Sequence, residues 1–197
     1  MKTLIQNIKT SIVVTLFFAI ILGIIYPISV WIVGKIIFPN QANGSLIINN
    51  KGEIIGSKLI GQQFVSSKYF HPRPSLAGTG YDAIASGGSN LGPTSQKLAD
   101  TIEQRIADYR QENNLDLSAK IPVDAVTASA SGLDPEISFE NATIQAARVA
   151  RARNIDVFKV NESIRKNIRK SEFGIFGEAG VNVLLLNMDL DNAYPVK

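Results

Sequence analysis

His71 is the only histidine in the 197-residue chain, and there is no cysteine, so few residues could perform chemistry. A zinc site or a serine–histidine–aspartate triad would have to use this imidazole, which lies between Phe70 and Pro72. A hydrolase that pairs Ser89 or Ser129 with His71 is a hypothesis that the residue types allow. A lone histidine is more often structural or exposed to solvent, and the sequence favours that interpretation.

Several segments resemble phosphate-binding motifs only in part. Residues 78–83, GTGYDA, match G-x-G-x-x-A but follow a proline-rich segment, whereas the dinucleotide fingerprint follows a strand. Residues 52–58, GEIIGSK, are one residue short of a phosphate loop and have Ser and Lys reversed. The arginines from Arg148 to Arg153 could bind phosphate, although on a helix they more often form a solvated face. We therefore predict no catalytic residue, no metal site and a chain that is not itself an enzyme.

Two loops rich in small residues are not explained by composition alone. Glycines permit positive φ angles, and short hydroxyl side chains satisfy backbone groups that no regular element pairs. The loops could be docking surfaces, a nucleotide cradle or two rigid turns that brace each other, and these alternatives stay open. The candidate assembly or nucleotide-related residues are Phe70, His71, Arg73, Pro74, Ser75, Ser86, Gly87, Gly88, Ser89, Asn90, Gly92, Pro93, Thr127, Ser129, Ser131, Gly132, Asp134 and Pro135.

An uncharged apolar segment precedes these loops and is flanked by Lys9 and Lys35. About 20 apolar residues suffice to cross a hydrocarbon core, so residues 10–38 predict one membrane-spanning helix after a stub of residues 1–9. A signal peptide would have a shorter apolar core and a small-residue cleavage site. A helix buried in a soluble core is rarely apolar on every side, and an interfacial helix needs a polar face. Residues 39–45 then form a polar linker to a soluble domain over residues 46–197.

The charges that flank the apolar segment indicate its orientation. Lys2, Lys9 and the terminal amine precede it, whereas Lys35 is the only charge between it and Lys51. Positive flanks tend to stay in the cytoplasm, so we expect a single-pass protein with a cytoplasmic N-terminus and an extracytoplasmic domain. Without Lys2, Lys9 and Lys35 the chain has 17 basic and 17 acidic residues, and this balance gives no reason to expect a nucleic-acid partner.

Short apolar runs predict the strands of the soluble domain. Residues 46–48 and 54–55 flank an Asn/Gly turn and indicate a hairpin, and residues 58–64 could form another strand or a short helix. Residues 181–187, VNVLLLN, are the strongest strand candidate of the chain. Together with the expected helices, these strands indicate a small α+β domain with α/β-like alternation.

Capping residues and apolar spacing predict three helices. The first begins at residues 94–95 and stops around residues 113–114, the second is capped by Ser138, and the third begins at Asp156. The long segment 71–95, crowded with Gly, Pro, Ser and Asn, is expected to be an ordered loop because aromatic residues accompany it.

Several motifs in order resemble one family. Residues 69–75 (YFHPRPS), 86–94 (SGGSNLGPT), 122–138 (PVDAVTASASGLDPEIS) and 176–184 (FGEAGVNVL) resemble the C subunits of bacterial Kdp potassium-transporting ATPases, the KdpC family. The resemblance runs from the anchor to Asp191. It departs from the family at three places: Ala130 replaces a usual glycine, Glu136 a frequent histidine, and Ala179-Gly180 a more usual Pro-Arg.

The resemblance implies a non-catalytic accessory subunit of an ATP-driven, high-affinity potassium uptake complex in the bacterial plasma (inner) membrane. The implied partners are the channel-like KdpA, the P-type ATPase KdpB that carries the catalytic centre, and the small membrane peptide KdpF. The family is described as a catalytic chaperone that raises ATP affinity, with nucleotide near the small-residue loops. An external domain cannot contact cytoplasmic ATP, so we expect no cofactor bound to this chain and an effect of ATP only through the complex. We expect the domain itself to act as a brace or cap near the potassium entrance of the channel-like subunit. A membrane-tethered binding module or hydrolase is the alternative.

Overall fold

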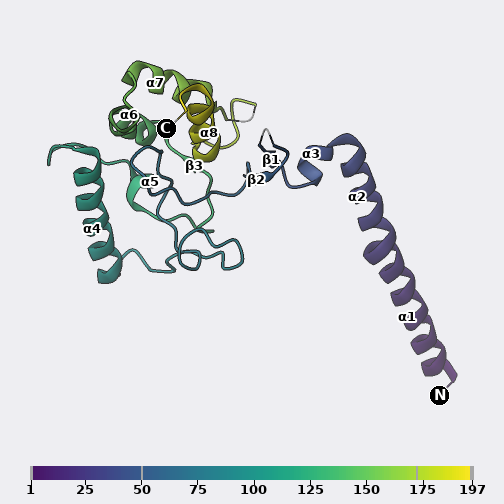
Figure 1. Ribbon diagram of the computed structural model, residues 1–197. Helices are drawn as coiled ribbons and strands as arrows, with labels where there is room; N and C mark the ends of the chain where they lie inside the picture. The colour runs from purple at the N-terminus through teal and green to yellow at the C-terminus, as the bar shows by residue number, and fades with distance from the viewer. Residues whose placement is uncertain (1, 50, 172, 196–197) are drawn as a thin grey trace. The chain divides into compact units, whose positions relative to one another are not determined.

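The computed structural model describes residues 2–49, 51–171 and 173–195 (Figure 1). It divides into two compact units, Met1–Ile55 and Gly56–Lys197.

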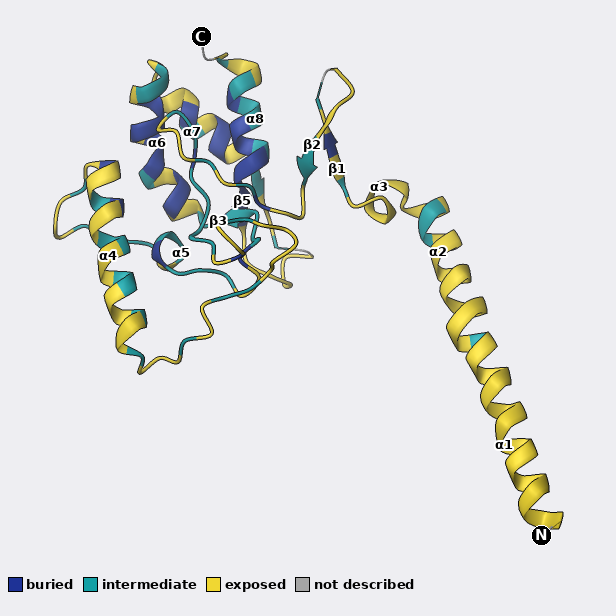
Figure 2. Ribbon diagram, turned by 60° about the horizontal axis from the view of Figure 1, so that its bottom comes forward, coloured by how far each residue is buried: buried dark blue, intermediate teal, exposed yellow. Residues whose placement is uncertain are grey.

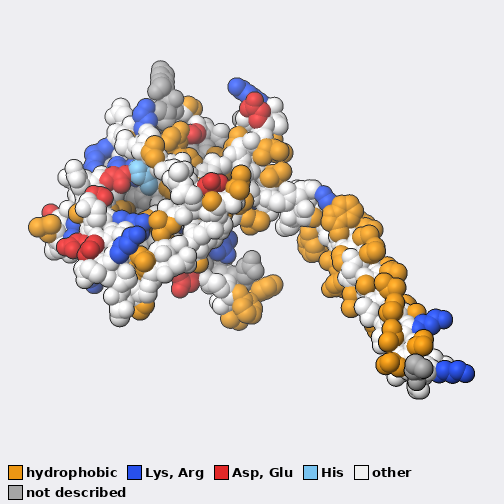
Figure 3. Space-filling view, turned by 90° about the horizontal axis from the view of Figure 1, so that it is seen from below, with side chains coloured by type: hydrophobic (Ala, Val, Ile, Leu, Met, Phe, Trp, Pro, Cys, Tyr) orange, Lys and Arg blue, Asp and Glu red, His pale blue; other side chains and the backbone are white. Residues whose placement is uncertain are grey.

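The first unit consists mainly of a long apolar helix that runs from Lys2 to Ile37. It comprises α1 (Lys2–Ile20), a π-helical turn η1 (Ile21–Ile25) and α2 (Tyr26–Ile37). Pro27 follows the π-helical turn, where its ring and missing N–H disturb the regular hydrogen-bond ladder. None of the described residues of these elements is buried, and hydrophobic side chains cover the helix (Figures 2 and 3). Its length and composition are those of a membrane span, as predicted.

A short helix and a hairpin follow the long helix. Helix α3 (Pro39–Ala42) lies within the predicted linker, and Lys35 at the end of α2 bonds to the side chain of Asn43. Strands β1 (Leu46–Ile48) and β2 (Ile54–Ser57) pair in a two-stranded sheet, which confirms the predicted hairpin. The Asn49 side chain accepts hydrogen bonds from the backbone N–H groups of Lys51 and Glu53, both at 2.9 Å, and so fixes the turn.

The second unit packs helices on a small antiparallel sheet. The helices that cover the core are α6 (Phe139–Arg153), α7 (Val157–Lys166) and α8 (Val183–Ala193). The sheet has the order β3-β5-β4, with β3 (Glu136–Ile137), β5 (Gly180–Asn182) and β4 (Ile168–Arg169). Val181 of β5 stands opposite both Ile137 and Ile168. The predicted class, an apolar helix followed by an α+β domain, is therefore confirmed.

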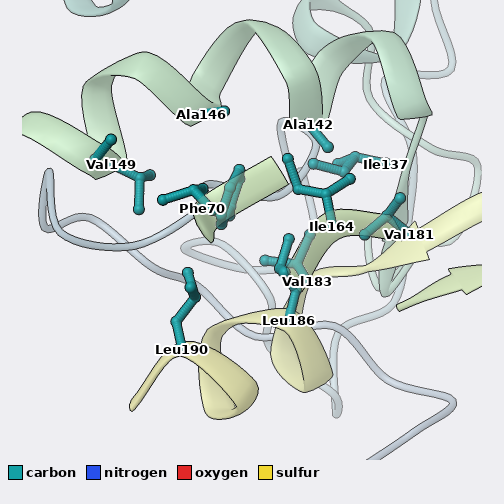
Figure 4. Close-up of a cluster of buried hydrophobic side chains, with 12 residues drawn as sticks. Phe70, Ile137, Ala142, Ala146, Val149, Ile164, Val181, Val183, Leu186 and Leu190 are labelled. Carbon is teal, nitrogen blue, oxygen red and sulfur yellow. The ribbon is translucent and has the colours of Figure 1, made fainter. Parts of the chain in front are cut away.

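The core lies between α6, α7, α8 and the sheet, and its side chains point toward one another (Figure 4). Burial of this apolar surface is the main favourable term in the folding of the unit. The buried hydrophobic cluster comprises Phe70, Ile137, Ala142, Ala146, Val149, Ala150, Val160, Ile164, Val181, Val183, Leu186 and Leu190.

The three predicted helix starts are confirmed, but only the second and third helices have the predicted side-chain cap, because Ser95 before the first makes no capping hydrogen bond. Ser138 accepts a hydrogen bond from the N–H of Asn141 at 3.1 Å, and Asp156 accepts one from Phe158 at 2.7 Å. Helix α4 (Gln96–Asn113) begins after Ser95 and ends at Asn114, whose φ of 54° is the left-handed conformation of a helix C-terminus. The short helix α5 (Val123–Val126) was not predicted.

Two strand predictions are wrong. Of residues 181–187 only the first two lie in β5, because the Asn182 side chain accepts from the N–H of Leu185 at 3.1 Å and starts α8 there. Val183, Leu184, Leu186 and Leu190 are all buried, so the apolar run lacks the polar face that would have revealed a helix. Residues 58–64 form neither strand nor helix beyond a single bridge between Ser57 and Ile60.

Candidate functional site

The first loop, residues 70–93, and the second loop, residues 127–135, lie against each other. No helix or strand occurs within residues 71–95, as predicted for this segment. The Ser86 hydroxyl and the Gly87 N–H both donate to the Ser131 carbonyl at 2.9 Å. The Ser75 hydroxyl donates to the Gly132 carbonyl at 2.6 Å. The two loops therefore brace each other, which is one of the alternatives that the sequence leaves open.

Glycine is required where the braced loops touch. Gly132 has a φ of 66°, and a Cβ there would lie 2.7 Å from the Gly87 carbonyl oxygen and 2.8 Å from the Ala77 nitrogen. Backbone atoms cannot give way as flexible side chains can. Gly88 is nearly as tight, since its Cβ would lie 3.0 Å from the Ala130 carbonyl oxygen. The contact therefore depends on the absence of a side chain at these positions.

A half-buried ion pair forms a second connection between the loops. Arg73 donates from Nη1 to the Asp134 carboxylate at 2.9 Å and from Nη2 to the Thr127 carbonyl at 3.4 Å. The Tyr81 hydroxyl donates to the Arg73 carbonyl at 2.9 Å. Burial, and then the negative charge of Asp134, raises the pKa of Tyr81, so this hydroxyl stays protonated and can donate to a more alkaline pH than an exposed tyrosine. The two loops are thus joined by backbone, hydroxyl and charged contacts together.

Two buried amide side chains attach the first loop to the core. Asn187 pairs with the backbone of Phe70, accepting from its N–H at 2.8 Å and donating to its carbonyl at 3.0 Å. Gln145 pairs with His71 in the same way, at 2.7 and 3.0 Å. Both amides are 1% exposed, so they replace the pairing that a neighbouring strand would give. Sequence reasoning missed these residues, whose only signal is a polar side chain inside an apolar helix pattern.

The His71 ring contacts one side chain and one backbone carbonyl from other parts of the domain. Its Nδ1 lies 2.6 Å from the Glu112 carboxylate, and its Nε2 lies 3.0 Å from the Ser66 carbonyl oxygen. The hydrogen bond from His71, helped by the charges of His71 and Arg148, lowers the pKa of Glu112 against the opposing effect of burial. Ser129 is likewise engaged, since its hydroxyl accepts from the Gly132 N–H at 2.9 Å. These contacts support the structural interpretation of His71.

Arg148 is buried, which corrects the interpretation of Arg148–Arg153 as a solvated face. Its side chain is 5% exposed and donates to the carbonyls of Ser67 at 2.8 Å and Tyr69 at 3.0 Å. It also donates to Gln145 at 2.7 Å, and it lies 3.6 Å from the Glu112 carboxylate. A planar guanidinium satisfies several acceptors at once, which explains why arginine occupies this site.

Arg153 of α6 is half-buried as a residue, but its guanidinium side chain is almost fully covered. Its side chain is 1% exposed, donates to the Lys68 carbonyl at 2.6 Å and pairs with Asp191 at 2.8 Å. It also lies over the Tyr69 ring, 5.0 Å from the centroid. Arg151, between them in the sequence, is exposed. Arg148 and Arg153 therefore hold the chain that enters the first loop, and only Arg151 fits the predicted solvated face.

A pocket of about 480 Å³ opens between the braced loops and α4. Gly88 and Ser89 of the first loop and Thr127 of the second line it, opposite Lys97 and Arg105. Arg105 also donates to the Val126 carbonyl at 3.1 Å, and its burial lowers the pKa of its guanidinium. No pattern in the sequence indicates this pocket, because α4 brings Lys97 and Arg105 to the loops only in the folded protein. Asn90, Gly92 and Pro93 lie on the exposed part of the first loop.

Comparison with known proteins gives consistent matches. The model of one protein family, described as "KdpC: K+-transporting ATPase, c chain", matches residues 8–192. A Mycobacterium tuberculosis relative is 52% identical over 186 residues, which cover 94% of this chain and 98% of the relative. A Beijerinckia indica relative is 45% identical over 194 residues, and the match covers 98% of each chain. An Acidobacterium capsulatum relative is 47% identical over 189 residues, covering 96% and 100%. All three carry the name Potassium-transporting ATPase KdpC subunit.

Proposed function

The chain belongs to the KdpC family of K+-transporting ATPase subunits, and we propose that it is a non-catalytic accessory subunit that the complex needs for assembly or activity. The observation that carries this proposal is the bracing of the two loops, in which the hydroxyls of Ser75 and Ser86 and the N–H of Gly87 bond to backbone carbonyls. Groups used in this way build a rigid surface, and a preorganised surface loses little entropy when a partner docks.

The proposed partners are a channel-like potassium-translocating subunit, KdpA, a P-type ATPase subunit, KdpB, and a small membrane peptide, KdpF. In this proposal the catalytic centre lies on KdpB. The lysines before the apolar helix favour a cytoplasmic N-terminus and an external soluble domain. An external domain cannot contact cytoplasmic ATP, so any effect on the ATP affinity of the complex is indirect. The domain acts as a brace or cap on the outer face of the channel-like subunit, near its potassium entrance.

The pocket beside α4 favours a second candidate function, direct binding of an anionic ligand such as a nucleotide. Lys97 and Arg105 supply positive charge to it, and Gly88 and Ser89 supply a small-residue wall. The pocket would then be the binding site of the membrane-tethered module that the sequence left as an alternative. This function requires no partner subunit, which distinguishes it from the proposal above.

Ile84 is the residue of the first loop best suited to anchor a docked partner. Its side chain is 97% exposed, and its N–H donates to the Asp82 carboxylate at 2.9 Å in a fixed turn. A large apolar group held in this way can enter a partner's pocket at low entropic cost. Leu117 is a matched control, because it is 86% exposed in the segment after α4 and not in either braced loop.

We expect Ile84→Glu to reduce co-purification of the channel-like and P-type subunits at least about tenfold, because the charge must be desolvated in the contact. The measurement is affinity capture of the tagged full chain from mildly solubilised membranes of potassium-starved cells. Leu117→Glu should leave the captured amounts unchanged. Capture of the unaltered chain without any ATPase subunit would contradict the proposed function, and equal capture by both variants would contradict the docking role of Ile84.

A further inference from the structure

Both ring nitrogens of His71 lie against oxygen atoms that accept hydrogen bonds. Nδ1 lies 2.6 Å from the Glu112 carboxylate, and Nε2 lies 3.0 Å from the Ser66 carbonyl oxygen. A neutral imidazole has a single N–H, so it would donate to one of these oxygens and turn the lone pair of its other nitrogen toward the second. The protonated ring has two N–H groups and satisfies both acceptors. The geometry therefore fits the imidazolium form of His71.

Two charged side chains on the neighbouring helices act on the ring in opposite directions. Glu112 of α4 favours the imidazolium, and the hydrogen bond from His71 is the largest cause that lowers the pKa of this carboxyl, so it stays ionised and accepts. Arg148 of α6 lies 3.6 Å from the same carboxylate and, as a like charge, opposes a second cation. The hydrogen bonds of Arg148 go to other acceptors, which are Ser67, Tyr69, Asn113 and Gln145. The ring is therefore the hydrogen-bonding partner of Glu112.

The other titratable groups around the ring add less. Burial raises the pKa of Tyr109, so this neighbour of Glu112 on α4 carries no charge near neutral pH. In the first loop, the charge of Arg73 is balanced by its ion pair with Asp134. Lys68 precedes the ring by three residues and adds a positive charge to the segment that enters the loop. The two hydrogen bonds of the ring thus remain the main reason for its protonation.

We propose that His71 is a pH-sensitive contact, in which the imidazolium holds the end of α4 to residues 66–71 and loss of one ring proton releases it. The His71 side chain is 22% exposed, so the proton can exchange with water while the domain stays folded. Histidine is the side chain that ordinarily changes charge between about pH 5 and 8. The contact is therefore closed at mildly acidic pH and opens as the pH rises.

The release is local, because other bonds still attach α4 to α6. The Tyr109 hydroxyl donates to the Asn141 side chain at 2.8 Å, and Arg148 donates to Asn113 at 3.2 Å. Neither bond involves the imidazole. The first loop begins at residue 70, so the pH around the domain sets how firmly α4 holds the start of this loop.

The single histidine of the chain permits a direct test, because every signal of a histidine label then comes from one ring. The full chain, labelled with ¹⁵N-histidine and purified through a tag without histidine, is reconstituted alone in phosphatidylcholine vesicles. Solid-state ¹⁵N NMR counts the protonated ring nitrogens between about pH 5.5 and 8.5. Amide hydrogen exchange of residues 66–71 is measured over the same range, as a protection factor that corrects for the intrinsic effect of pH. Glu103→Gln is the matched control for Glu112→Gln, because Glu103 is exposed on the same helix.

We expect two protonated ring nitrogens at about pH 5.5 and one at about pH 8.5, with protection of residues 66–71 at least about threefold lower at the higher pH. Near the midpoint, Glu112→Gln should lower the ratio of doubly to singly protonated ring at least about threefold, whereas Glu103→Gln leaves it unchanged. In His71→Gln the protection should not depend on pH. A ring with one proton throughout would overturn the proposal, and so would unchanged protection when the second proton is lost. No partner subunit is present, so the result is independent of the role proposed above in potassium transport.

Discussion

Replacing Gly132 by valine is expected to separate the braced loops and to lower the free energy of unfolding by roughly 2–5 kcal/mol. Gly132 has a φ of 66°, a conformation that a β-branched residue rarely adopts. The added Cβ would also lie 2.7 Å from the Gly87 carbonyl oxygen and 2.8 Å from the Ala77 nitrogen. The backbone of one loop must therefore move away from the other, and the bonds that Ser86 and Gly87 make to Ser131 are lost.

The variant Gly52→Val distinguishes the two causes of this loss of stability, which are the positive φ angle and the close contact between the loops. Gly52 has a φ of 83°, but no described atom lies within 4 Å of the place that its Cβ would take. It should therefore cost only the backbone term of about 1–2 kcal/mol. The measurement is urea unfolding of the full chain in detergent micelles, followed by circular dichroism. A loss at Gly132 no larger than the loss at Gly52 would show that the close contact between the loops contributes nothing to stability.

Replacing Arg148 by methionine should lower the free energy of unfolding by about 3–5 kcal/mol, since it removes one partner of a buried charge network. Methionine retains much of the length and apolar volume of the arginine stem. It leaves the carbonyls of Ser67 and Tyr69 without this donor, and it removes the positive charge of Arg148 from beside the Glu112 carboxylate. The first loop begins directly after these carbonyls, so we also expect faster amide hydrogen exchange over residues 66–71.

Arg151→Met on the same helix is the matched control. Arg151 is exposed, and exposed substitutions change stability by no more than about 0.5 kcal/mol. Urea unfolding of both variants under one set of conditions compares the two positions directly. If the two substitutions cost the same, the buried guanidinium does not hold the loop, and the role assigned to Arg148 is wrong.

Local signals predicted much of the fold. Ser138 and Asp156 were identifiable as caps because their short oxygen-bearing side chains precede helical spacing, and both cap as expected. The segment 181–187 was predicted to be a strand but is mostly helical, and the reason is physical. A helix buried on several sides has no polar face, and its apolar run cannot be told from that of a strand. The capping hydrogen bond of the Asn182 side chain determines that a helix begins here, but in the sequence this signal consists of only one residue.

The two loops of the candidate site were predicted from the sequence, but the contacts between them were not. Residue types indicated that the loops could adopt positive φ angles and satisfy backbone groups with hydroxyls, yet the bond between Ser86 and Ser131 joins positions 45 residues apart. The roles of Gln145 and Asn187 depend on burial, which a single polar residue in a helix pattern does not reveal. Arg148 was misplaced for the same reason, since a solvated arginine and a buried one look alike in a sequence.

Potassium-stimulated ATP hydrolysis by the transport complex, measured with and without this chain, tests whether the complex requires the chain. The complex is purified through a tag on its P-type subunit, from cells that express the full chain and from cells in which its gene is deleted. We predict that potassium stimulates hydrolysis only when the chain is present and that re-expression of the chain restores the stimulation. A complex that assembles without the chain and hydrolyses ATP at the same potassium-stimulated rate would contradict its role as a required accessory subunit.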